Sequence, residues 1–150
     1  MFIENPLNQS PWSFPILECI HIVGFAFSVG TIAIVDFRLL GLGMRHQSPP
    51  QLLEDTWIWS LVGIVVMIFS GLLLFSSDPD MYAPNPAFNF KMVVLALAIL
   101  FNYTIRRKTA SAEVMPPYAK IVGGTSLALW GAVVFGGIFI AFVNAALYVR

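Results

Sequence analysis

The chain has 150 residues, of which 58% are hydrophobic and only 11% are charged, and its formal net charge is zero. Soluble domains are about 45–50% apolar and about 25% charged, so the composition indicates a membrane protein. The balanced charge does not support a general nucleic-acid surface, and the single cysteine, Cys19, excludes an intramolecular disulfide.

Four apolar stretches are long enough to cross a bilayer, which needs about 20 mainly apolar residues. We expect an all-α, integral membrane four-helix bundle that forms a single transmembrane domain over residues 1–150. The segment before the first stretch has no Lys or Arg, so we expect a retained helix and not a signal peptide. The predicted spans are residues 14–42, 57–75, 88–105 and 121–148.

Basic residues in short loops predict the orientation, because Lys and Arg are retained on the cytoplasmic side. They gather around the loop between the first two spans and the loop between the last two. We therefore expect both of these loops in the cytoplasm and both termini on the outer side. The residues concerned are Arg38, Arg45, Arg106, Arg107, Lys108 and Lys120.

The first predicted span carries ionisable residues near its outer end, where each needs a partner. Glu18 and His21 are three residues apart and share a helix face. The third predicted span places Lys91 and Met92 at a similar depth. We predict that Glu18 pairs with Lys91 and that His21 faces the bundle interior.

Two interpretations of this outer layer remain open. It is either an interhelical tie, in which His21 donates to a backbone carbonyl or to Ser70, or a ligand site. In the ligand site Glu18, His21, Lys91 and Met92 would bind a cofactor, with His21 and Met92 as metal ligands. Imidazole and thioether suit Cu(I) or haem iron, so haem b and copper are the candidate cofactors.

Two related metal sites are excluded by the sequence. A di-iron bundle needs a second Glu-x-x-His pair, which the chain lacks. Two histidines of one chain could not bind one haem, because the only other histidine, His46, lies on the inner side.

At the inner ends of the first and third predicted spans, Asp36 and Arg106 lie at similar depth, together with Asn102 and Tyr103. We predict an Asp36–Arg106 pair as one use of these charges. Interface anchoring is the alternative, and we expect Arg38 to reach the lipid headgroups with its long side chain.

Small residues recur every four positions in the last predicted span, at Gly124, Ala128, Ala132 and Gly136. Such spacing lets helices approach closely in lipid. Packing against Gly24 and Ser28 of the first span is one explanation. The other is contact with a second copy or with another membrane subunit.

No GxSxG, HExxH or P-loop motif is present, so the sequence favours a non-catalytic protein. Three short motifs nevertheless suggest a family. They are ExxHxxG from Glu18, DxRLLG from Asp36 and NFKM from Asn89. With their surroundings they resemble an uncharacterised bacterial family of small four-helix inner-membrane proteins, which is distantly similar to the copper resistance protein CopD family.

This resemblance implies a multi-pass protein of the bacterial inner membrane, linked to copper handling or to haem binding and electron transfer. Related proteins often carry a histidine near the inner end of the third span, where this chain has Asn102 and Arg106. The alternative function is a structural or accessory subunit of a larger membrane complex, or a homo-oligomer, with no ligand.

Overall fold

The computed structural model describes residues 5–44 and 46–148, without the side chains of Pro6 and of residues 144–148. Arg45 lies outside the described residues. All regular structure in the described part is helical, which confirms the predicted all-α class. The elements are η1 (Pro6–Gln9), α1 (Ser13–Leu39), α2 (Pro49–Ser77), α3 (Pro79–Tyr82), α4 (Pro86–Phe101), the π-helix η2 (Asn102–Arg106), α5 (Arg107–Ala110) and α6 (Ala119–Tyr148).

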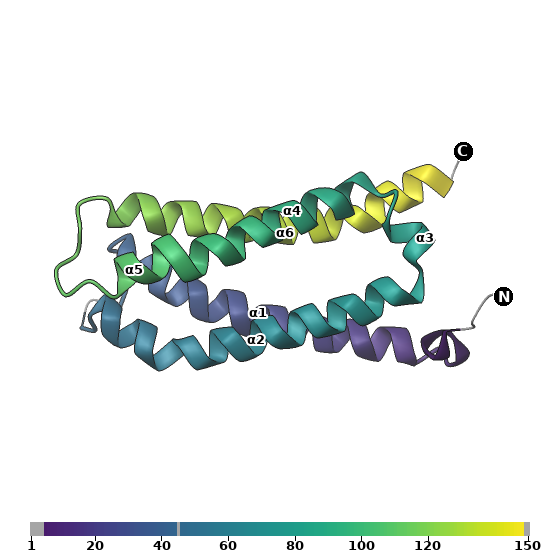
Figure 1. The fold of residues 1–150 in the computed structure, drawn as a ribbon, viewed down its shortest axis with the longest axis horizontal. Coiled ribbons are helices and arrows are strands. Elements are labelled where there is room, and N and C mark those ends of the chain that lie inside the picture. Colours follow the sequence, from purple (N-terminus) through teal and green to yellow (C-terminus); the bar gives the residue numbers. More distant parts are fainter. Residues whose placement is uncertain (1–4, 45, 149–150) are drawn as a thin grey trace.

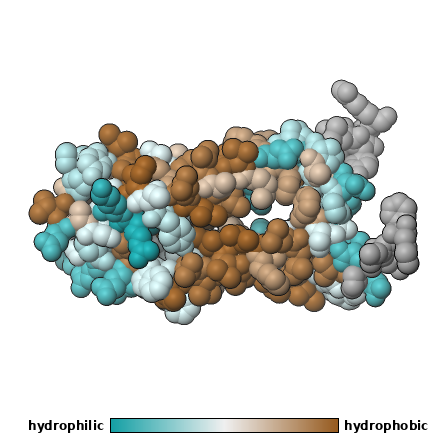
Figure 2. Space-filling model, in the orientation of Figure 1, coloured by the Kyte–Doolittle hydropathy of each residue, from teal (hydrophilic) through white to brown (hydrophobic). Residues whose placement is uncertain are grey.

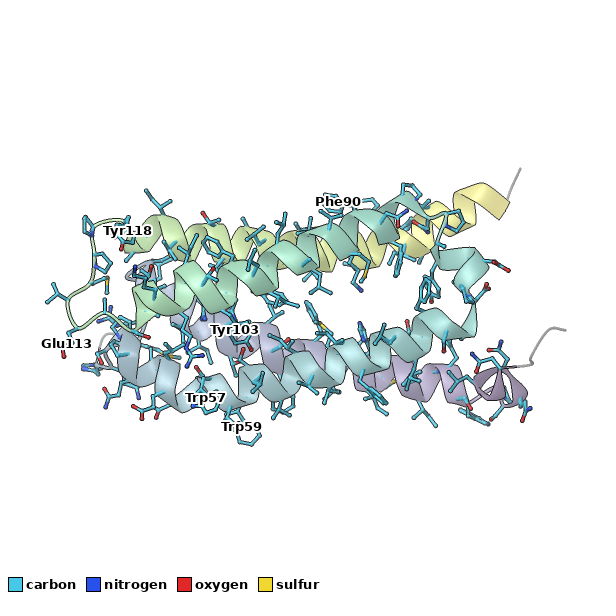
Figure 3. All side chains as sticks on the ribbon, in the orientation of Figure 1. Trp57, Trp59, Phe90, Tyr103, Glu113 and Tyr118 are labelled. Carbon is cyan, nitrogen blue, oxygen red and sulfur yellow. The ribbon has the colours of Figure 1, made fainter. Side chains whose placement is uncertain are left out.

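Four helical segments of the described chain are long and apolar enough to cross a membrane, in agreement with the predicted number of spans. They are α1, α2, the continuous segment from α4 through α5, and α6 up to residue 143. Figure 2 shows a hydrophobic band around the middle of the molecule and hydrophilic surfaces at both ends. Trp59 and Phe90 point outward from this band (Figure 3), so the helices present apolar side chains to lipid.

Three helix boundaries differ from the predicted ones. The second span begins at Pro49 and not at residue 57, because the Ser48 side chain accepts a hydrogen bond from the Gln51 N–H and proline fits a first helical turn. The first span ends at Leu39, shortly before Gly41 and Gly43, whose φ angles of +80° and +79° suit glycine. The third span continues beyond residue 105 to Ala110, through η2 and α5.

The four spans form two antiparallel hairpins, α1 with α2 and α4 with α6 (Figure 1). The hairpins meet where α1 contacts α6 and where α5 contacts α2. This is the end that carries the two basic loops. Toward α3 the hairpins diverge, so the bundle is closed at one end and wider at the other (Figure 1).

Glycines mark the closest helix contacts, and these differ from the predicted ones. Gly24 and Ser28 pack against Gly63 of α2, not against the last span. A Cβ added at Gly63 would lie 2.6 Å from the Ser28 backbone nitrogen. In α6, a Cβ at Gly136 would lie 3.0 Å from the Lys91 Cβ of α4, so this part of the small-residue series packs within the chain.

We predict that Gly63→Ala lowers the free energy of unfolding in detergent by about 1–3 kcal/mol, because backbone atoms must move to admit the methyl group. Gly30→Ala on α1 is the matched control, since a Cβ there would meet nothing within 4 Å. It should be neutral or stabilising by up to about 1 kcal/mol. Equal effects of the two substitutions on unfolding would contradict the close α1–α2 packing.

Candidate functional site

A buried ion pair joins the two hairpins at the basic end of the bundle. Arg106 Nε donates to Asp36 Oδ1 at 2.5 Å, and the two side chains are 3% and 0% exposed. The prediction that Asp36 pairs with Arg106 is confirmed. Two further bonds hold the guanidinium, from Nη1 to Asn102 Oδ1 at 2.8 Å and from Nη2 to the Ile32 carbonyl oxygen at 2.8 Å.

The π-helix Asn102–Arg106 positions this arginine. A π-helix has a wider turn than an α-helix and is frequent at functional sites. Here it leaves both Asn102 and Arg106 buried while Tyr103 is exposed. Arg38 Nε donates to the Gln47 carbonyl oxygen at 2.7 Å and so ties the first loop to α1, while its expected contact with lipid headgroups stays a prediction.

Three buried polar atoms in the described part of the chain lack a hydrogen-bond partner, and one of them belongs to Asp36 itself. They are Asp36 Oδ2, Ser126 Oγ and Trp130 Nε1. The Ser126 hydroxyl nevertheless lies close enough to affect the Asp36 carboxyl group. Unpartnered polar atoms inside a membrane bundle are costly. The Asp36–Arg106 ion pair therefore offsets most of the free-energy cost of burying the Asp36 carboxyl group.

His21 forms the main polar contact at the wider end. Its Nδ1 lies 3.0 Å from Ser70 Oγ, and Ser70 Oγ in turn donates to the Val66 carbonyl oxygen at 2.6 Å. With the Ser70 hydroxyl proton on the Val66 carbonyl, the tautomer that fits this contact has Nδ1–H as the donor to Ser70. The lone pair of the neutral ring is then on Nε2. The expected contact of His21 with Ser70 is confirmed.

Glycines let His21 and Lys91 lie close to neighbouring helices. A Cβ at Gly71 of α2 would be 3.1 Å from His21 Cε1, and one at Gly137 of α6 would be 3.5 Å from Lys91 Nζ. Each hairpin thus contributes one polar side chain. The positive charge of Lys91 acts on the His21 ring, so the two groups lie within electrostatic range. Both are half-buried.

The predicted Glu18–Lys91 pair is wrong. Among the described residues, the ion pair formed is Arg106–Asp36, and no carboxylate pairs with Lys91. Glu18 is exposed on α1, and its negative charge acts on Tyr82 of the short α3 segment. There burial raises the pKa of Tyr82, and the negative charges of Glu18 and Asp78 raise this pKa further. No salt bridge therefore joins Glu18 to Lys91 beside His21.

Aromatic side chains cover the α3 end of the space between the hairpins. Phe88 of α4 stacks on Phe75 of α2 with ring centroids 5.4 Å apart, and Tyr82 lies 5.6 Å from Phe88. Met92 follows Phe88 by one helical turn on the same face, with 44% of its surface exposed. Figure 2 shows a hollow between the hairpins toward this end. His21 of α1 and Lys91 and Met92 of α4 belong to the spans that border this hollow, which we call the outer hollow.

The donors available for a metal in the outer hollow are few. No group of three or more His, Cys, Asp or Glu side chains in the described part of the chain could hold a metal ion. A metal there would rely on His21 Nε2, with the Met92 thioether as the second donor that the sequence suggested. Such a pair suits an iron already held by a macrocycle better than a bare ion.

These features define a multi-pass membrane protein of four helical spans with ionisable side chains inside the bundle. Residues 14–143 match a family model described as Family of unknown function (DUF6644), and the chain belongs to this family. No curated protein and no solved structure matches the chain. The distant likeness to the copper resistance protein CopD family therefore stays an expectation from short motifs.

Sequence reasoning missed Ser126 and Trp130, and it missed the π-helix. Ser126 is a single hydroxyl in an apolar segment, which is a weak signal for a buried polar group. Trp130 is 1% exposed and belongs to the central core, although tryptophan in a membrane helix more often marks an interface. Spacing alone does not reveal a π-helix, because its residues look like those of the surrounding α-helix.

We predict that Asp36→Asn lowers the free energy of unfolding by about 3–5 kcal/mol, because Arg106 would remain buried without a counter-ion. Arg38→Gln is the control near the same helix end, and it should cost only about 1 kcal/mol through its single bond to Gln47. The measurement is denaturant unfolding in detergent followed by circular dichroism. Similar losses for both variants would show that the buried pair has no special role.

Proposed function

We propose that this protein is a non-catalytic haem-binding membrane protein, with the outer hollow as its cofactor site. The observation that carries the proposal is that two polar groups, His21 and Lys91, lie on opposite hairpins within electrostatic range of each other. His21 has an unused Nε2 lone pair, and Lys91 is a half-buried cation without a carboxylate partner in the described part of the chain. One group suits an axial ligand, and the other suits an acidic substituent of the same cofactor.

The surroundings of these two groups are compatible with a flat amphiphilic molecule. The imidazole is oriented through Nδ1 by Ser70, which is the kind of contact that sets the direction of a ligating histidine. Phe75, Tyr82 and Phe88 provide an aromatic cover at the α3 end. In this proposal Lys91 would pair with a carboxylate group of haem, and His21 and Met92 would hold its iron. Haem, when bound, supplies one-electron redox chemistry.

Electrostatics favours haem over a bare copper ion in the outer hollow. The charge of Lys91 would oppose a second cation at His21, whereas it stabilises the carboxylate groups of haem. Copper handling is therefore the second candidate for the same site, with His21 and Met92 as ligands. An accessory subunit without a ligand is the third, and the α6 packing at Gly136 gives it little support.

We infer the orientation from the basic residues. The end of the bundle that carries Arg106, Arg107, Lys108 and Lys120 would face the cytoplasm, and the outer hollow would open nearer the other surface of the bacterial inner membrane. Any electrons passed through the cofactor would then come from a partner on the outer side or within the membrane.

We predict that protein purified from haem-replete cells, or mixed with hemin in detergent, shows a Soret band that His21→Ala abolishes. His46→Ala is the matched control, because His46 is the only other histidine and is exposed in the loop before α2. It should keep the band. Lys91→Met should keep the band but weaken haem binding about tenfold or more, through loss of a charge-assisted contact.

The measurement is absorption spectroscopy combined with metal analysis. If the wild-type protein contains one copper ion per chain and shows no Soret band, the ligand of the proposed site is copper and not haem. Wild-type protein with neither, after both have been supplied, would overturn a metal-centred function. A Soret band that persists in His21→Ala would place the haem elsewhere.

A further inference from the structure

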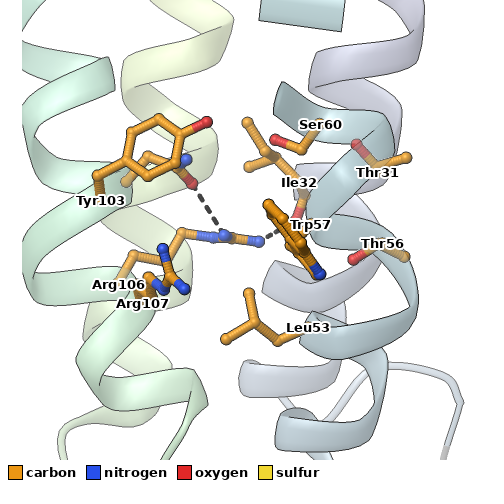
Figure 4. A pocket seen from close by; sticks show the side chains of 10 residues that line it. Thr31, Ile32, Leu53, Thr56, Trp57, Ser60, Tyr103, Arg106 and Arg107 are labelled. Atoms are coloured by element: carbon orange, nitrogen blue, oxygen red, sulfur yellow. Dashed lines mark hydrogen bonds between the residues drawn. The ribbon is translucent and has the colours of Figure 1, made fainter. Parts of the chain in front are cut away.

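A small polar cavity lies beside Arg106, on the side of α2 and well away from the outer hollow (Figure 4). Its volume is about 20 Å³, which is room for one water-sized group. The residues that matter here come from α2 and from the end of the third span. They are Trp57, Ser60, Asn102, Tyr103, Arg106 and Arg107.

The two arginines give this cavity an unused capacity for an anion. A guanidinium has five N–H groups, and Arg106 uses three of them on Asp36, Asn102 and the Ile32 carbonyl. Two remain. Arg107 also lines the cavity, is exposed, and forms no ion pair in the described part of the chain. Since Asp36 balances Arg106, the net charge of the cavity is that of Arg107.

Two consecutive arginines line this cavity at the point where the π-helix passes into α5. Arg106 ends the π-helix and is buried, and Arg107 begins α5 and is exposed. Figure 4 shows Arg106 extended toward Trp57 and Ile32, with Arg107 beside it and Tyr103 on the same side. The cavity therefore has a buried cation, an exposed cation and an aromatic rim.

The position of the rim indicates the source of the anion. Trp57 is 46% exposed and Tyr103 is 37% exposed, and such side chains are enriched where a helix passes the headgroup region. Arg107 lies within one turn of the end of the span at Ala110. Basic pockets between transmembrane helices at this depth bind acidic lipid headgroups.

We propose that this cavity is a binding site for the phosphate of an anionic phospholipid, independent of the haem proposal. One phosphate oxygen enters the cavity beside Arg106, and Arg107 balances the charge of the headgroup. The acyl chains extend along the apolar surface of α2. The lipid would thus stabilise the contact between the two hairpins at this end of the bundle.

The test uses the full chain, delipidated in a neutral detergent, and titrates phosphatidylglycerol while native mass spectrometry counts the bound lipid. Arg107→Gln should weaken this binding about fivefold, the effect of one basic residue at an acidic surface. Lys108→Gln is the matched control, because it removes the same charge from the adjacent, exposed position outside the cavity. It should leave the affinity of the specific site unchanged.

Two further titrations identify the source of the phosphate. Phosphatidylcholine should bind several-fold more weakly than phosphatidylglycerol, and inorganic phosphate at equal concentration should not compete. Competition by inorganic phosphate would overturn the lipid assignment in favour of a free anion. Equal weakening by Arg107→Gln and Lys108→Gln, or no bound phosphatidylglycerol, would overturn the site itself.

Discussion

An ion pair inside the membrane is the constraint on which the arrangement of the other helices depends. Asp36 and Arg106 are both buried, and they lie on opposite hairpins. A lone charge on a membrane helix costs about 2.5–3.5 kcal/mol or more, so neither side chain can stay buried without the other. The hairpins must therefore meet at this level, and the bond from Arg106 to the Ile32 carbonyl oxygen is a second contact between them.

Because the ion pair joins the hairpins at one end of the bundle, the hairpins can lie further apart at the opposite end. There the hairpins diverge, and His21 belongs to one hairpin and Lys91 to the other. Each is placed against glycines of its own hairpin, so the position of each side chain is set within the hairpin and not by contact across the space. A rigid end and a wider end in one small bundle are well suited to holding a ligand between preformed walls.

A feature of this structure could be predicted from the sequence when its physical cause lies within one segment of the chain, and less well when it depends on how helices pack. Helix number and class follow from long apolar runs. The Asp36–Arg106 pair was predicted from matching depth, and it forms because the two residues also face each other. The start of α2 at Pro49 was missed because a serine cap and two prolines inside a polar stretch read as a linker. The Glu18–Lys91 pair failed because matching depth does not specify helix rotation, and Glu18 is exposed. The partner of Gly63 likewise depends on which helices are neighbours, and no spacing within one helix specifies that.

A double-mutant cycle tests the central role of the ion pair most directly. Unfolding free energies would be compared for the wild type, Asp36→Leu, Arg106→Met and the double variant. Because each single variant leaves one unpaired buried charge and the double variant leaves none, the double variant should be more stable than the sum of the single effects predicts, by about 2–3 kcal/mol. Single effects that add to within about 0.5 kcal/mol would show that the two side chains are not coupled, and the hairpins would then be joined by apolar packing alone.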